Sequence, residues 1–128
     1  MTVDVRAVGL GAGVALVIGV PMAVIAQAVI AVTDDTPGWV PALSAIILAG
    51  FVAGGFVAGS KRPDTPSLHG ALAAVSAFLV VQLLGVVLIA ARGDDLRPVA
   101  YGFNAFVAAA CGTVGGLIAD RRSVRARS

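Results

Sequence analysis

Four long apolar stretches, none of which contains Asp, Glu, Lys or Arg, divide the chain. They cover residues 7–32, 40–59, 68–91 and 98–119. A bilayer core about 30 Å thick is crossed by about 20 helical residues, and backbone polar groups in lipid must be satisfied within the crossing segment. The pattern therefore predicts an all-α membrane protein. Its four transmembrane helices form a bundle in a single domain over 1–128, with 120–128 as a basic tail.

Composition agrees with the apolar pattern. Hydrophobic residues make up 59% of the 128 positions and charged residues only 12%, and the mean hydropathy is +0.98. Soluble domains hold about 25% charged residues. A soluble enzyme, a nucleic-acid-binding module and a disordered tail are therefore excluded. The partners that this composition leaves are the lipid bilayer and other membrane proteins, with no nucleic acid among them.

The first stretch shares two features with a signal peptide. Arg6 precedes it, and Ala26-Gln27-Ala28 is a small-x-small sequence of the kind found at cleavage sites. However, signal peptides have an apolar core of about 7–15 residues, and the core here is longer and continues to Val32. We expect the first stretch to be retained as a membrane span.

The basic residues lie unevenly along the chain. Arg92 and Arg97 lie between the third and fourth stretches, and the other seven lie at the opposite ends of the spans: Arg6, Lys61, Arg62, Arg121, Arg122, Arg125 and Arg127. Positive charge favours the cytoplasmic side, so both termini are predicted to be cytoplasmic. Trp39 and Tyr101 then lie at the outer interface, which aromatic residues favour. Eight arginines against one lysine, in an alanine-rich chain, indicate a GC-rich bacterial genome.

The two halves of the chain share a plan. A shift of 60 residues places Asp34-Asp35 on Asp94-Asp95, Lys61-Arg62 on Arg121-Arg122, and Gly55 on Gly115. Both halves would have the same orientation in the membrane, as in parallel repeats about an axis along the membrane normal. The sequence therefore predicts two tandem helical hairpins.

Small residues four apart let neighbouring helices approach closely. The first stretch offers Gly9 and Gly13, and the helix-packing candidates in the second and fourth stretches are Gly50, Gly54, Gly55, Gly59, Gly112, Gly115 and Gly116. The two pairs in the second stretch are offset by five residues, so they lie on more than one helix face. Either one face is free for a partner or a second copy, or all of the glycine packs the four helices together.

Polar residues within the spans are few. No span contains a carboxylate, Lys or Arg, although ion-coupled transport usually needs an ionisable group at membrane depth. Gln27, Gln82 and Asn104 either line an uncharged polar path or form hydrogen bonds between helices. Metal-ligand clusters, a phosphate-binding loop and a nucleophile with its base are missing from the sequence. We therefore expect no enzyme activity, no catalytic residue and no cofactor.

The aspartates, the histidine and the basic residues near the span ends each have a structural and a functional interpretation. The outer aspartates, Asp34, Asp35, Asp94 and Asp95, are solvated loop ends or ligands of a divalent cation. His69 is tolerated at the interface or senses pH. Cys111 has no disulfide partner and is expected to pack as a small residue. The remaining basic residues either anchor the topology or bind lipid headgroups, and those of the tail could instead dock a partner: Lys61, Arg62, Arg121, Arg122, Arg125 and Arg127.

Three segments resemble small bacterial four-helix membrane proteins of the YrzE-like type. They are the glycine-rich segment Ala49–Gly59 with its Lys61-Arg62 loop, the start of the third stretch at Leu68-His69-Gly70-Ala71-Leu72, and Gly112-Thr113-Val114-Gly115-Gly116. The resemblance covers about half of the chain. It implies a four-helix inner-membrane fold without an assigned activity, and therefore no catalytic residues.

These patterns favour a structural or accessory membrane protein that packs against itself or a larger membrane complex through glycine-rich helix faces. The alternative is a small homo-oligomeric channel or transporter with Gln27, Gln82 and Asn104 along its path. Small multidrug exporters have comparable size and helix number, but they need a carboxylate in their first helix, and the first stretch of this chain has none. A holin-like pore former is a third hypothesis, based only on small size and a basic tail.

Overall fold

The computed structural model describes residues 2–33, 37–93, 95 and 98–128. Within these residues the chain forms four helices and no strand: α1 (Val5–Thr33), α2 (Val40–Lys61), α3 (Pro66–Arg92) and α4 (Pro98–Arg127). All four are long and apolar enough to cross a membrane. The predicted all-α fold with four membrane-spanning helices is therefore confirmed, and it supports a multi-pass membrane protein.

The helix bounds differ from the predicted stretches mainly at the C-terminal end. α1, α2 and α3 extend their stretches by at most two residues at either end. By contrast, α4 continues to Arg127, so most of the expected tail forms its last turns. No glycine or proline follows Gly116. Because Ala and Arg are good helix formers, nothing in this segment stops the helix.

Local signals set several of the other helix ends. Oδ1 of Asp4 accepts hydrogen bonds from the backbone N–H of Arg6 (3.0 Å) and of Ala7 (3.1 Å), and so caps α1. α3 begins with Pro66, whose fixed φ and missing N–H suit a first helical position. The same helix ends at Gly93, which has a φ of +75° and adopts the left-handed conformation typical of a helix terminus.

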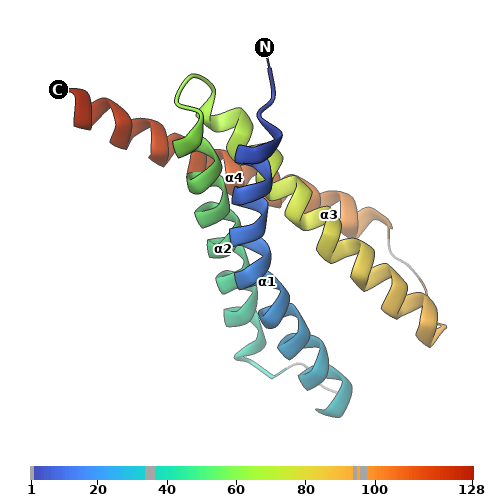
Figure 1. The fold of residues 1–128 in the computed structure, drawn as a ribbon. Helices are drawn as coiled ribbons and strands as arrows, with labels where there is room; N and C mark the ends of the chain where they lie inside the picture. The colour runs from blue at the N-terminus through green and yellow to red at the C-terminus, as the bar shows by residue number, and fades with distance from the viewer. Residues whose placement is uncertain (1, 34–36, 94, 96–97) are drawn as a thin grey trace.

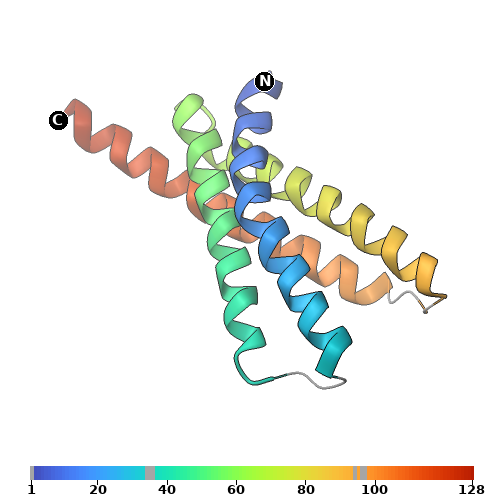
Figure 2. The ribbon, with the colours of Figure 1, turned by 60° about the horizontal axis from the view of Figure 1, so that its bottom comes forward.

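The four helices are arranged as two hairpins (Figure 1). α1 packs beside α2, and α3 packs beside α4. The hairpins meet near the end that carries the N-terminus and the α2–α3 connection, which we call the terminal end (Figures 1 and 2). They diverge toward the α1–α2 and α3–α4 connections, which we call the loop end. α2 contacts both helices of the other hairpin, whereas within the described residues α1 and α4 do not touch.

The buried core is concentrated where the hairpins meet. Phe51 of α2 and Phe78 of α3 pack edge to face, with ring centroids 6.5 Å apart. In α3 every buried residue lies between His69 and Phe78, whereas Leu83 and Val87, nearer the loop end, are exposed. The diverging halves of the hairpins thus present apolar side chains to their surroundings, as helices in a bilayer do.

Candidate functional site at the helix crossing

α1 and α2 meet backbone to backbone through glycine. A Cβ added to Gly54 would lie against the carbonyl oxygen of Gly11 and 2.9 Å from Cβ of Ala15. A Cβ added to Gly50 would lie 3.0 Å from Cγ2 of Ile18. Since real Cβ atoms essentially never come within 3.0 Å of such neighbours, no larger residue fits at Gly54 without a shift of backbone. Gly50 and Gly54 therefore form the side of α2 that faces α1.

The second glycine pair of α2 faces α4 instead. A Cβ on Gly55 would lie against the carbonyl oxygen of Gly112, and one on Gly59 would lie 2.9 Å from Cα of Gly116. A Cβ on Gly115 of α4 would in turn clash with the backbone of α2. The offset of five residues thus turns the two pairs of α2 toward different helices. Both of those helices belong to the same chain.

α3 joins the crossing through a glycine that the sequence analysis did not single out. A Cβ on Gly70 would lie against the carbonyl oxygen of Gly112 and 3.1 Å from the backbone N of Gly116. Gly112 therefore meets the backbones of α2 and α3 at once. All seven glycines expected to pack helices lie at such contacts within the chain: Gly50, Gly54, Gly55, Gly59, Gly112, Gly115 and Gly116.

In α1 the packing glycine is Gly11 rather than either of the two glycines that the sequence analysis singled out. Gly9 and Gly13 have no atom within 4 Å of an added Cβ. Ala7, Gly11 and Ala15 are buried and follow one another at a spacing of four, so they set the face of α1 that packs in the chain. Because Gly9 and Gly13 differ from this row by two residues, they face away from it. The row of small residues at 7, 11 and 15 is the signal that would have identified Gly11.

His69 lies next to Gly70 and is the one buried polar or charged side chain in the described part of the chain, with an exposed fraction of 0%. Its Nε2 accepts a hydrogen bond from the backbone N–H of Asp4 at 3.0 Å. Its Nδ1 lies 3.0 Å from the backbone oxygen of Thr65 and 3.0 Å from Oγ1 of the same residue. Since Nε2 is an acceptor, the neutral ring carries its proton on Nδ1. The ring thus links the start of α1 to α3.

An ion-pair cluster lies beside this histidine. Nη2 of Arg62 is 2.9 Å from Oδ2 of Asp64, and Nη1 is 3.6 Å from Oδ2 of Asp4. The hydrogen bonds from Arg62 hold the pKa of Asp64 at about 2. The backbone N–H of Ala7 is the main cause that holds the pKa of Asp4 below its ordinary 3.8. Arg62, which the sequence groups with lipid-facing basic residues, is instead half-buried and paired with two carboxylates.

The other basic candidates lie exposed at the terminal end. The guanidinium carbon of Arg122 is 5.5 Å from the ring centroid of Phe56, a cation–π contact between α4 and α2. A pocket of about 290 Å³ on α4 is lined by Ile118, Arg121, Arg122 and Arg125. The exposed basic residues expected to face lipid are Lys61, Arg121, Arg122, Arg125 and Arg127.

Residues 4–119 match the family described as "Protein of unknown function (DUF3792)". The chain belongs to the DUF3792 family. The matched residues include the whole helix crossing together with Asp4 and His69. No curated protein and no solved structure matches the chain. Membership of an uncharacterised family agrees with the coarse form of the resemblance seen in the sequence, and the narrower YrzE-like placement stays a prediction.

The three amides expected along a polar path are not brought together in this DUF3792 chain. Gln27 of α1 and Asn104 of α4 are exposed, and within the described residues their helices do not touch. Gln82 of α3 is partly buried, and its Oε1 lies 3.9 Å from the Cβ position of Gly85 on the same helix. A path lined by all three amides would therefore need a second chain.

Several candidates at the loop end of this DUF3792 protein cannot be placed. Three outer aspartates lie outside the described residues: Asp34, Asp35 and Asp94. Tyr101 lies within α4, but its side chain is not described. Asp95 is exposed. In the part of the chain that the structure describes, no three His, Cys, Asp or Glu side chains come together as metal ligands. Cys111 is partly buried in α4 with a free thiol.

Proposed function

We propose that this protein is a structural or accessory membrane protein that associates with a second copy of itself through one face of α1. The glycine faces of α2 and α4 are occupied by helices of the same chain. Another helix could use them only by separating this bundle. Association therefore needs a face that the crossing leaves open, and α1 has one.

The open face of α1 carries two glycines and an amide. Gly9 and Gly13 have no neighbouring atom within 4 Å of an added Cβ. Gln27 follows Gly9 by 18 residues, about five turns of an α-helix at about 3.6 residues per turn, so it lies on the same side. Its side chain is exposed, and within the described residues no hydrogen bond involves it. Gln27 is the single observation that carries the proposal.

An amide that faces hydrocarbon lacks the hydrogen bonds that water would supply. Polar side chains that bond across membrane helices contribute about 0.6–2 kcal/mol, and glycines spaced by four let two helices approach closely. In a pair of α1 helices related by a two-fold axis, Gly9, Gly13 and Gln27 would each meet their own counterparts. A second copy therefore satisfies the amide and covers the open glycines at once. A larger membrane complex is the other outcome of the test.

The proposal places the terminal end in the cytoplasm of a bacterial cell and assigns no reaction to the chain. The orientation is supported by the basic residues at this end, since positive charge is retained on the cytoplasmic side. A non-enzymatic role is supported by the polar cluster of Asp4, Arg62 and His69. These side chains are committed to capping α1 and to joining it to the α2–α3 connection.

The test is co-isolation of two differently tagged copies from membranes in a mild detergent, followed by the mass of the isolated complex. Gly13→Leu and Gln27→Leu are expected to abolish co-isolation and to leave the helix content unchanged. Gly102→Leu is the matched control, because Gly102 also has open space around its Cβ position but lies on α4. The proposal is wrong if the wild-type copies never co-isolate, or if Gly13→Leu and Gly102→Leu associate equally well.

A further inference from the structure

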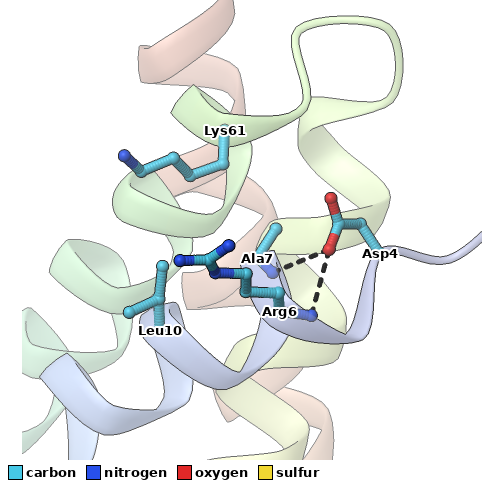
Figure 3. Close-up of a pocket in the computed structure, with 5 residues that line it drawn as sticks. All are labelled: Asp4, Arg6, Ala7, Leu10 and Lys61. Atoms are coloured by element: carbon cyan, nitrogen blue, oxygen red, sulfur yellow. Dashed lines mark hydrogen bonds between the residues drawn. The ribbon is translucent and has the colours of Figure 1, made fainter.

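Two basic side chains from different helices converge at the terminal end. Arg6 lies in the first turn of α1, and Lys61 is the last residue of α2. Figure 3 shows both side chains extending to the same side of the helix pair, above Leu10. Together they border a pocket of about 300 Å³ whose lining is Asp4, Arg6, Ala7, Leu10 and Lys61.

The one carboxylate of this pocket is already engaged. Oδ1 of Asp4 accepts the backbone N–H groups of Arg6 and Ala7, as the dashed lines in Figure 3 show, and Oδ2 lies 3.6 Å from Arg62. Within the described residues, no ion pair involves Arg6 or Lys61. The pocket therefore presents two positive charges that no side chain neutralises by direct pairing.

The floor of the pocket is aliphatic. Ala7 is buried, and Leu10 is 48% exposed. Leu10 follows Arg6 by four residues, so it lies about 6 Å deeper along α1 at about 1.5 Å per residue. Cations at the helix ends with an aliphatic side chain one turn deeper match an amphiphile whose head is an anion and whose tail follows the helix. A free anion would leave Leu10 uncovered.

The other basic groups at this end lack such an arrangement. Arg62 is held by Asp4 and Asp64. The arginines that line the pocket on α4 all come from one helix, and Arg122 among them lies over the ring of Phe56. In the described part of the chain, the convergence of unpaired cations from two helices thus occurs at Arg6 and Lys61.

We propose that the pocket between α1 and α2 binds the phosphate of an anionic phospholipid through Arg6 and Lys61, with an acyl chain over Leu10. This site goes beyond the proposed self-association and does not depend on it. It fits a lipid of the leaflet at the terminal end, because both cations stand at the ends of membrane-spanning helices. Basic residues at that depth are attracted to anionic headgroups.

The test is native mass spectrometry of the full chain in detergent, titrated with phosphatidylglycerol and separately with phosphatidylcholine. The double variant Arg6→Gln, Lys61→Gln is expected to weaken phosphatidylglycerol binding by about 25-fold, since the loss of each cation weakens it about fivefold. Its phosphatidylcholine binding should not change. The double variant Arg125→Gln, Arg127→Gln is the matched control. It removes two positive charges from the same end of the chain and leaves the pocket intact.

Several results would overturn the proposal. Equal losses in the two double variants would show that general charge, and not the pocket, attracts the lipid. Displacement of phosphatidylglycerol by an equal concentration of inorganic phosphate would show a plain anion site without a role for the acyl chain. Circular dichroism of each variant checks that the helices are retained. As a second variant that leaves both charges in place, Leu10→Ser should weaken phosphatidylglycerol binding and spare any binding of inorganic phosphate.

Discussion

The backbone N–H of Asp4 donates a hydrogen bond to Nε2 of His69, 3.0 Å away and 65 positions along the chain. This bond joins the residue that precedes and caps α1 to the first turn of α3, at the point where the two hairpins meet. The imidazole ring is fully buried, so its polar atoms depend on protein partners. The same Asp4 caps α1 with its side chain. Residue 4 therefore fixes both the start of α1 and its place against α3.

Replacement of this histidine should destabilise the bundle. His69→Leu would leave the N–H of Asp4 without an acceptor, which costs about 1–3 kcal/mol for a buried donor. His69→Gln should retain more of the stability, because its amide oxygen can take the place of Nε2. Thermal unfolding in detergent, followed by circular dichroism, measures both variants. If His69→Leu were as stable as the wild type, the hydrogen bond would have no structural role.

The crossing glycines should tolerate no added methyl group. Gly55→Ala would press its Cβ against the backbone of Gly112, and overpacking of this kind costs about 1–3 kcal/mol or more. Gly102→Ala is the control, since open space surrounds that position and alanine favours the helix. Melting temperatures should fall for Gly55→Ala and stay level or rise for Gly102→Ala. Equal melting temperatures in the two variants would contradict the close crossing.

Acid should weaken the ion pairs at the terminal end. The pKa of Asp64 is held at about 2 by Arg62, and that of Asp4 lies below 3.8, so the unfolded chain binds more protons than the folded one as the pH falls through this range. The stability from these pairs is present above pH 3.8 and is lost as the pH falls toward about 2. Melting temperatures between pH 6 and 2 should therefore fall less steeply in Asp64→Asn than in the wild type. If the melting temperatures of the two proteins fell in parallel with pH, the Arg62–Asp64 pair would contribute nothing to stability.

The sequence predicted the helices well because membrane spans depend on local composition. A run without charged residues can be recognised from neighbouring positions alone, without knowledge of the fold. α2 and α3 accordingly begin and end within two residues of the predicted stretches. The shift of 60 residues also maps α1 onto α3 almost end to end. The tail was predicted less well, because charge marks the edge of the membrane and not the end of a helix. α4 therefore continues through its arginines to Arg127.

The partners of the candidate residues were harder to predict, because they are set by how the helices cross. The offset between Gly54 and Gly55 indicated two faces, yet only the structure shows that both faces meet helices of the same chain. The sequence places His69 at the start of a membrane span, and nothing in the sequence indicates its hydrogen bond with the backbone N–H of Asp4. Arg62 could have been paired with Asp64 from their spacing of two, whereas its contact with Asp4 depends on the fold.

The central claim is that the glycine crossing packs the four helices of one chain together, whereas the open face of α1 packs against α1 of a second copy. Oxidative cross-linking in membranes tests it most directly, with Gly13→Cys in a chain that also carries Cys111→Ser. Disulfides form only when the two Cα atoms lie within about 7 Å. We predict a covalent dimer from Gly13→Cys and none from Gly102→Cys, an equally open position on α4. A Gly13→Cys chain that stays monomeric, or a Gly102→Cys chain that links as readily, would contradict the account.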